Sequence, residues 1–179
     1  MALMRGYFGV GVEGLSKSVN ASNLFRTAHA FGGRFVFTIR ATDTAHDAML
    51  DTSRAIENMP YYAWGSVEEM VLPKGCQLVG VELIEGAVDL PSFKHPANAA
   101  YVLGAERGSL SPALLERCDH VVKIPAQFCV NVAIAGSIVM YDRMLTLGRY
   151  AARPVMPGGP AARTDNAGHR WGRPVQRRS

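Results

Sequence analysis

The sequence predicts an α/β fold, with a mainly parallel sheet and flanking helices, and three observations support this. Strand-like apolar runs alternate with helix-like segments along the first 150 residues. The run at 77–83 (QLVGVEL) is nearly all apolar, as expected for a central parallel strand that is buried on both faces. The runs at 101–103 and 121–124 end in small or polar residues. Open α/β sheets bind ligands at such strand ends, so we expect a ligand crevice there.

Before residue 77 we expect three strands and one well-defined helix. The strands are at residues 7–12, 34–39 and 61–64. The helix begins at Ser22 or Asn23, either of which can cap it, and runs to about Phe31, where two glycines end it. A further helix is expected at 45–50 and a capped helical turn at 66–70.

After the strand at 121–124, a long helix is expected at 131–150, and a shorter helix precedes that strand. The first three turns of the long helix are apolar all round, so we expect it to be buried on more than one side. Core packing or a subunit interface would provide that burial. The sequence beyond is rich in proline, glycine and arginine, which is typical of disorder. We therefore predict one domain at 1–150 and a basic, disordered tail at 151–179.

The composition is that of a soluble globular protein, with 48% hydrophobic and 19% charged residues. No apolar run approaches the roughly 18–20 residues of a membrane helix, and the N-terminus lacks the apolar region of a signal peptide. The three cysteines have no metal-ligand spacing, and the five histidines form no close pair. Free thiols are typical of a reducing compartment. We expect a cytoplasmic protein with no membrane segment and no metal.

Positive charge is concentrated at the end of the chain. Of the net charge of +4, the tail contributes +5, from six arginines and one aspartate, which leaves −1 for residues 1–150. A basic tail can contact phosphate backbones, and it can equally be a solubilising end. The other possible source of positive charge is a local patch formed by Arg5, Lys17, Arg26, Arg34 and Arg40.

Gly9, Gly11 and Gly14 match the G-x-G-x-x-G fingerprint of dinucleotide-binding folds. Such a site needs a helix that opens within the glycines and an acidic residue about 20 residues further on. The segment after Gly14, LSKSVNAS, is not expected to open a helix, and the first acid after Glu13 is Asp43. A dinucleotide-dependent oxidoreductase is therefore a weak alternative.

Three separated blocks resemble the SpoU (TrmH-like) branch of the SPOUT methyltransferases. Residues 20–26 (NASNLFR) are similar to the family's N-x-G-N-x-x-R, and 103–110 (LGAERGSL) to its G-x-E-x-x-G-L. The dipeptide Ile-Pro at 124–125, followed by CVNV at 129–132, is similar to its I-P…S-L-N-V. The order and spacing of the blocks agree with the family, and the resemblance covers about residues 5–150.

The resemblance implies an S-adenosylmethionine-dependent RNA methyltransferase that acts on ribose 2′-hydroxyls. It also implies a deep trefoil knot near the C-terminus that holds the cofactor, and a homodimer with the active site and the last helix at its interface. General topology rules count against knots, so the knot rests on the resemblance alone. The RNA is expected to be tRNA rather than rRNA, because the chain shows no separate N-terminal RNA-binding domain.

The motifs, matched residue by residue, give the expected site. The catalytic residues are Arg26, Glu106 and Asn131, and the RNA-binding residues are Asn23 and Arg26. The cofactor-binding residues are Val81, Gly104, Ile124, Cys129 and Val130. Arginine stays protonated in proteins, so Arg26 is expected to grip the target phosphate and polarise the hydroxyl. Glu106 could bond Arg26 or orient loop amides. Asn131 could cap the last helix, hold the cofactor loop or the ribose, or do both.

Two residues depart from the family pattern. Ser22 stands where the family has glycine, and Cys129 stands where it has serine, in a short loop. Cysteine is a weaker hydrogen-bond partner than serine, and Cys129 could instead be a small apolar residue packed under the loop. These departures motivate a second alternative, an RNA-binding protein of this fold without turnover.

Overall fold

The structure is a computed structural model that describes residues 6–15, 18–42, 59–104, 108–148 and 150. Several expected features lie outside the described residues, namely the helix at 45–50, the tail at 151–179, Arg5, Lys17 and Glu106.

Seven strands of the described chain form one sheet, in the order β3-β2-β1-β6-β4-β7-β5. Every neighbouring pair is parallel, so the predicted α/β class with a mainly parallel sheet is confirmed. The strands are β1 (Tyr7–Glu13), β2 (Phe35–Ile39), β3 (Tyr61–Trp64), β4 (Gln77–Val81), β5 (Val88–Asp89), β6 (Asn98–Gly104) and β7 (His120–Lys123). The helices are α1 (Ser18–Ala30), the 3-10 helix η2 (Leu90–Ser92), α3 (Pro112–Arg117) and α4 (Val132–Leu147).

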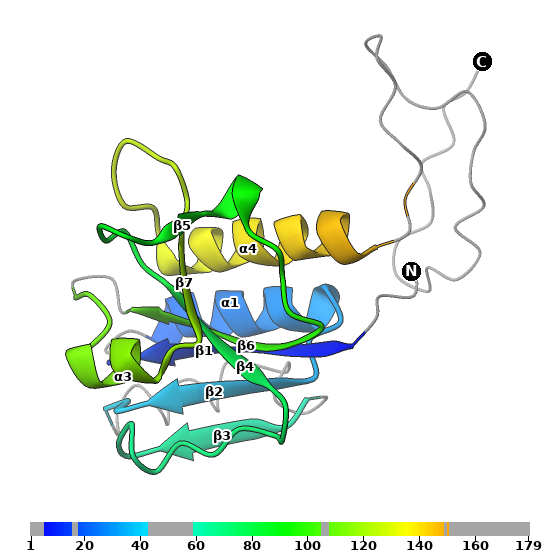
Figure 1. Cartoon of the computed structure of the whole chain (residues 1–179). Helices are drawn as coiled ribbons and strands as arrows, with labels where there is room; N and C mark the ends of the chain where they lie inside the picture. The colour runs from blue at the N-terminus through cyan, green and yellow to red at the C-terminus, as the bar shows by residue number, and fades with distance from the viewer. Residues whose placement is uncertain (1–5, 16–17, 43–58, 105–107, 149, 151–179) are drawn as a thin grey trace, which may run out of the picture.

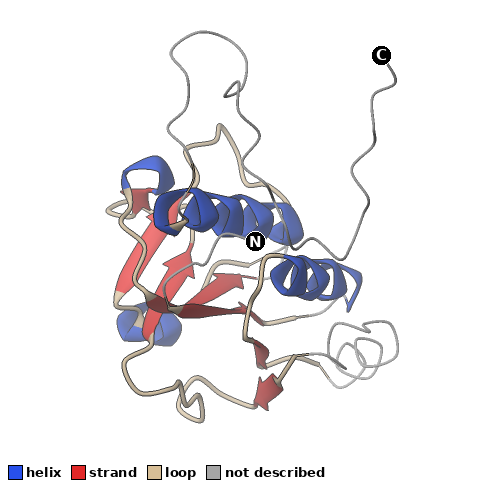
Figure 2. Cartoon of the chain, turned by 90° about the vertical axis from the view of Figure 1, so that its right-hand side faces the viewer, coloured by secondary structure: helices blue, strands red, loops and turns tan. Residues whose placement is uncertain are grey.

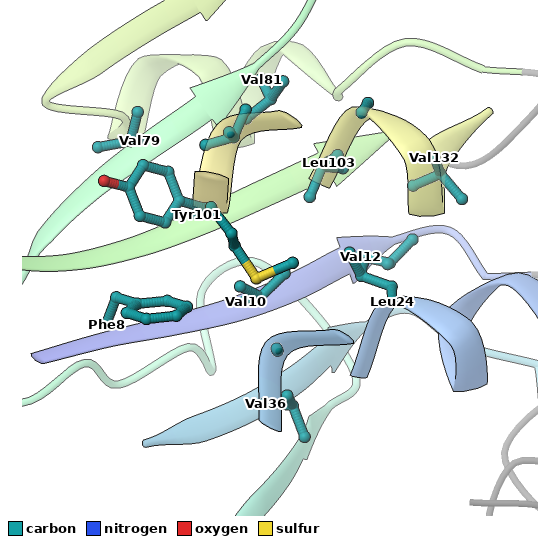
Figure 3. Packing of buried hydrophobic residues seen from close by; sticks show 14 of the residues in the cluster. Phe8, Val10, Val12, Leu24, Val36, Val79, Val81, Tyr101, Leu103 and Val132 are labelled. Carbon is teal, nitrogen blue, oxygen red and sulfur yellow. The ribbon is translucent and has the colours of Figure 1, made fainter. Parts of the chain in front are cut away.

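Two long helices, α1 and α4, lie side by side on one face of the sheet (Figures 1 and 2). They approach closely, because a Cβ on Gly136 would lie 2.1 Å from the Cδ1 of buried Leu24. Side chains of the sheet, among them Val10 and Tyr101, fill the core beneath them (Figure 3). Buried Leu114 of α3 belongs to a second cluster, which covers the opposite face. The sheet is therefore buried on both sides, as its apolar central strands require.

The predicted start of α1 is wrong by one turn. The helix begins at Ser18, so Ser22 and Asn23 lie inside it and are not its caps. The backbone carbonyl of Asn23 instead accepts a hydrogen bond from the Thr27 hydroxyl at 2.7 Å. The reason is that Ala21, one turn before Leu24, is also fully buried. Packing therefore extends the apolar face of the helix beyond the point that local capping residues indicate.

The glycines of the G-x-G-x-x-G motif make room for aromatic rings. Gly9 and Gly11 lie within β1, and a Cβ on either would meet the ring of Phe35 or Phe37 at 2.3 Å. Only a residue without a side chain fits under those rings. The expectation that no helix opens after Gly14 is wrong, since α1 follows it closely. A dinucleotide fingerprint, however, requires the glycines in the turn rather than within the strand.

Helix α4 is buried on one side only, so the expectation of burial on more than one side does not hold within a single chain. Val132, Ala135, Val139 and Met140 face the core, as does Arg143. The opposite side exposes three large apolar residues at helical spacing, Ile134, Ile138 and Tyr141. The helix ends at Leu147, earlier than expected, because Gly148 adopts an extended conformation.

Short elements complete the fold. Residues 66–70 contain the expected capped turn, in which the Ser66 hydroxyl accepts the Glu69 amide at 3.4 Å. Strand β5 and the 3-10 helix η2 were not expected, because each is only two or three residues long.

The trefoil knot stays a prediction. Within the described residues, no helix combines the length and apolar character needed to cross a membrane.

Candidate functional site

A cavity of about 380 Å³ opens at the carboxyl ends of three adjacent strands, β6, β4 and β7. We call it the strand-end cavity. Its walls come from the residues after β4, the end of β6 and the segment beyond it, the loop between β7 and α4, and the start of α4. The lining residues are Val81, Glu82, Leu83, Leu103, Gly104, Gly108, Ser109, Ile124, Ala126, Phe128, Cys129, Val130, Val132 and Ala135. Its position is the one that open α/β sheets use for ligands, and its volume suits a small molecule.

All five residues expected to bind a cofactor line this cavity. They are Val81, Gly104, Ile124, Cys129 and Val130. Val81 and Gly104 end strands, Ile124 follows β7, and Cys129 and Val130 lie in the loop between β7 and α4. The parallel sheet therefore brings together positions that are up to about 50 residues apart in the sequence. Their role toward a cofactor stays a prediction, but their common location is a finding.

Gly104 has a steric reason to be glycine. A Cβ there would lie 2.7 Å from the Gly108 carbonyl oxygen and 3.3 Å from the Leu110 amide nitrogen. The chain after β6 therefore folds back against the strand end, and any larger residue would push this segment away. Since Gly104 and Gly108 both line the strand-end cavity, the close approach of backbone to backbone shapes its wall.

Two carboxylates hold this returning segment from either side. Glu82, after β4, accepts the Leu110 amide at 2.8 Å. Buried Glu13, at the end of β1, accepts the Ser111 amide at 2.7 Å and the Ser111 hydroxyl at 2.6 Å. Because β1 and β4 flank β6 in the sheet, consecutive amides are fixed by the two neighbouring strands. Glu13 also pairs with Arg40, whose Nη2 lies 2.6 Å away.

Sequence reasoning missed Glu13 and Glu82. Glu82 had a usable signal, since it is the first polar residue after the apolar run at 78–81 and therefore stands at a strand end. Glu13 lies within the glycine motif, and no role was assigned to it from the sequence. Phe128, which is 74% exposed and lies in the loop between β7 and α4, was also missed.

Asn131 is the N-cap of α4, which confirms that expected alternative. Its Oδ1 accepts the Ala133 amide at 2.9 Å, and its Nδ2 donates to the Oδ1 of Asn20 at 3.2 Å. The first and third motif blocks therefore meet at the start of α1 and α4. Asn131 stands between Val130 and Val132, which line the strand-end cavity. A catalytic role for Asn131 stays a prediction.

Arg26 and Asn23 are exposed on α1 and do not belong to the lining of the strand-end cavity. Arg26 follows Asn20 by six residues, which places it about 9 Å further along the helix axis. Because α1 returns toward the amino edge of the parallel sheet, Arg26 lies farther from the cavity than Asn20 does. The structure therefore does not bring Arg26 and the cavity residues together within one chain. Glu106, the other catalytic candidate, lies outside the described residues.

The thiols of this region differ in environment. Cys129 is exposed and lines the cavity, so the expectation that it packs under the loop is wrong. Cys118 packs closely against β4, since a Cβ on Gly80 would lie only 3.0 Å from its sulfur, and burial raises the pKa of its thiol to about 11. Within the described ranges, no group of three or more potential ligand side chains could hold a metal ion.

Comparison with known proteins identifies the family of the chain. The model of the SpoU rRNA Methylase family matches residues 8–141. This range contains most of α4 and all the described strands, except for the first residue of β1. The chain belongs to the SpoU rRNA Methylase family.

Relatives within this family have names that describe related activities. A Staphylococcus aureus (strain COL) protein named as a TrmH family tRNA/rRNA methyltransferase is 25% identical over 139 residues, or 73% of this chain. The match covers 56% of that protein, so the chain spans about half the length of such relatives. A shorter match, 32% identical over 69 residues, covers 37% of this chain and 28% of the Acinetobacter baylyi 23S rRNA (guanosine-2′-O-)-methyltransferase RlmB.

Solved structures support the SpoU fold. The AviRb methyltransferase of Streptomyces viridochromogenes, in complex with the cofactor AdoMet, superposes with a TM-score of 0.68 at 20% identity. The superposition covers 80% of this chain and 61% of the AviRb chain. An AdoMet-bound rRNA methyltransferase of Sinorhizobium meliloti gives a TM-score of 0.69 at 21% identity, over 82% of this chain and 59% of that one. At these identities, the likeness establishes the fold.

Proposed function

We propose that this chain transfers a methyl group from S-adenosylmethionine to a ribose 2′-hydroxyl of an RNA. The observation that carries the proposal is the strand-end cavity, which is built from the second and third family motifs. The names of the relatives support it, because they include RNA methyltransferases, and one of them is a guanosine-2′-O-methyltransferase. Two of the similar structures contain AdoMet. Transfer to tRNA rather than rRNA, and action in the cytoplasm, belong to the same proposal.

The residues present fit such a cofactor. The lining combines apolar side chains with small residues and exposed backbone, which can receive an adenine ring and hydrogen-bond its edges. Val81, Leu103 and Ile124 supply the apolar surface, and the backbone near Gly104 can approach a ligand closely. When bound, S-adenosylmethionine supplies a methyl group on a positively charged sulfur, so the donor is already activated. The protein must align the hydroxyl and stabilise its developing negative charge.

A second copy of the chain is proposed to complete this site. Arg26 lies away from the cavity of its own chain, and α4 exposes Ile134, Ile138 and Tyr141 on the side opposite the core. An apolar stripe of this kind is typical of helices that pack against a partner. In a homodimer through α4, Arg26 of one protomer would serve the cavity of the other. There its guanidinium would grip the phosphate of the target nucleotide and polarise the 2′-hydroxyl.

The single basic patch considered from the sequence does not form as a unit. Arg34 precedes β2 and Arg40 follows it, so about 20 Å of strand separates them. Arg40 is also paired with Glu13. We therefore attribute RNA binding to Arg26 and Asn23 near the dimer interface, together with the basic tail at 151–179.

The test is methyl transfer from labelled S-adenosylmethionine to total tRNA and to rRNA, followed by nuclease digestion to locate the methyl on ribose. We expect Arg26→Ala to lower the transfer rate by about 100-fold or more, with cofactor affinity unchanged. Arg34→Ala is the matched control, since it removes an exposed arginine at the amino edge of the sheet. Full activity of Arg26→Ala would refute the assigned role.

The alternative, an RNA-binding protein of this fold without turnover, is favoured by one observation. Cys129 stands exposed in the cavity where the family motif has serine. In that case the wild-type chain binds RNA and cofactor without forming product, and Cys129→Ser should create methyl transfer. Measurable methyl transfer by the wild type, at the same rate as by Cys129→Ser, would exclude this alternative.

A further inference from the structure

Among the described residues that line the strand-end cavity, one side chain is charged. Of the fourteen described residues that line it, Glu82 alone carries a charged side chain; the others are apolar residues, glycines, one serine and one cysteine. A carboxylate on the wall of a mainly apolar cavity is costly to desolvate unless it has a partner.

The carboxylate of Glu82 is held in a fixed position. One oxygen accepts the Leu83 amide at 2.9 Å, and the other accepts the Leu110 amide at 2.8 Å. The backbone amide of Glu82 is itself bound to the Val122 carbonyl at 3.0 Å, which continues the contact between β4 and β7. Each carboxylate oxygen can accept a further hydrogen bond or contact a cation. The negative charge is thus preorganised on the cavity wall without a cationic side chain of the described chain against it.

We propose that Glu82 recognises the positive charge of the methyl donor and gives the cavity a preference for the donor over the product. The inference rests on the proposed function, because it assumes that the cavity binds S-adenosylmethionine. In the donor, the sulfur is a sulfonium cation. Transfer moves the methyl from sulfur to the ribose oxygen, leaves the electron pair of the broken S–C bond on sulfur, and releases the hydroxyl proton to water.

The consequence is a change of charge next to Glu82 during each turnover. S-adenosylhomocysteine has a neutral thioether sulfur, so its attraction to a fixed carboxylate is weaker than that of the donor. The interaction between unit charges at contact distance near a protein surface is large enough to change affinity by about tenfold or more. Glu82 therefore strengthens binding of the donor more than it strengthens binding of the product.

The experiment compares the dissociation constants of S-adenosylmethionine and S-adenosylhomocysteine by calorimetry, for the wild type, Glu82→Gln and Glu13→Gln. Glu13→Gln is the matched control, because Glu13 accepts the neighbouring amide of the same segment but does not line the cavity. We expect Glu82→Gln to weaken the donor about tenfold more than the product. In Glu13→Gln, both ligands should weaken equally, so their ratio stays that of the wild type.

A purely structural role of Glu82 would weaken both ligands equally in Glu82→Gln and would overturn the inference. A contact with the ammonium group, which both ligands share, would give the same result and overturn it too. If Glu82→Gln does not fold, the inference is tested by the salt dependence with which the wild type binds the donor and the product. Donor affinity must then fall more steeply with ionic strength than product affinity, and equal slopes would contradict the inference. Wild-type protein that binds neither ligand would instead refute the proposed function.

Discussion

At the residue scale, two thiols near the cavity should differ sharply in reactivity. Burial raises the pKa of the Cys118 thiol to about 11, so it carries little thiolate at pH 8, whereas Cys129 is exposed. We predict that iodoacetamide modifies Cys129 at least tenfold faster than Cys118, as measured by mass spectrometry of peptides over time. Excess S-adenosylmethionine should slow modification of Cys129 only, because that residue lines the cavity.

A matched control for this labelling uses NAD in place of S-adenosylmethionine, at the same concentration. NAD should give no protection, since the glycines of the dinucleotide-like motif pack under Phe35 and Phe37. Protection of Cys129 by NAD alone would count against the assigned cavity and would revive the oxidoreductase alternative.

At the element scale, α4 is anchored at both ends. Asn131 joins its start to α1, and buried Arg143 ties its last turns to the amino edge of the sheet. Nη1 of Arg143 donates to the Pro96 carbonyl at 2.6 Å, and Nη2 donates to the Ala97 carbonyl at 2.6 Å. Since Val132 and Ala135 of α4 line the cavity, these anchors also fix one cavity wall.

A buried histidine beside this anchor should make stability depend on pH. The ring of His95 is hydrogen-bonded to the Tyr101 hydroxyl at 2.6 Å and to the Asp142 carboxylate at 2.9 Å. Burial lowers its pKa below the ordinary 6.5, although the bond to Asp142 opposes this and Arg143 contributes to the lowering. The unfolded chain therefore binds a proton near pH 6.5 that the folded chain does not bind.

The resulting stability is present above pH 6.5 and is lost as the pH falls below it, toward the folded pKa. We predict that the free energy of unfolding, measured by urea titration, decreases between pH 7.5 and 5.5. His95→Gln should show a smaller decrease over the same range, because it removes the titrating group. The four other histidines remain in both proteins, so the difference between the two curves isolates His95. Identical slopes for the two proteins would show that His95 does not contribute.

At the scale of the whole molecule, the exposed stripe of α4 should form the dimer interface. Replacing Ile138, which is 37% exposed in the single chain, by lysine would bury an unpaired charge in that interface. We predict that Ile138→Lys shifts the chain from dimer to monomer in light scattering and lowers methyl transfer by at least tenfold. The control is Tyr62→Lys on β3, at the far edge of the sheet, which should leave the dimer intact. A monomeric wild type would contradict the dimer.

Much of the fold could be predicted because its signals are local. The parallel β1, β4 and β6 are apolar runs bounded by glycine or polar residues, and they were found near their observed positions. The start of α1 was misplaced because burial of Ala21, a tertiary effect, overrode the capping residues. The one-sided burial of α4 could not be foreseen either, since an apolar helix does not reveal whether its second face meets the same chain or another.

The candidate site was predictable to the extent that it lies in motif blocks. Val81, Gly104 and Ile124 were found to share a cavity, because the first two end strands, Ile124 directly follows one, and parallel strands align their ends. Glu13 and Glu82 were missed, since their importance comes from amides that lie 98 and 28 residues away in the sequence. Arg26 could be identified by its motif alone. Because it lies away from the cavity of its own chain, the proposed dimer is needed to bring an Arg26 to each cavity.

The most direct test of the central claim is calorimetric titration of S-adenosylmethionine into the wild type, Ala126→Trp and Gln127→Trp. Ala126 lines the strand-end cavity, whereas its exposed neighbour Gln127 does not, so the two bulky substitutions differ only in whether they fill the cavity. We predict binding to the wild type and to Gln127→Trp, and loss of binding in Ala126→Trp. Absence of binding to the wild type, or equal binding to all three proteins, would contradict the assignment of this cavity to the methyl donor.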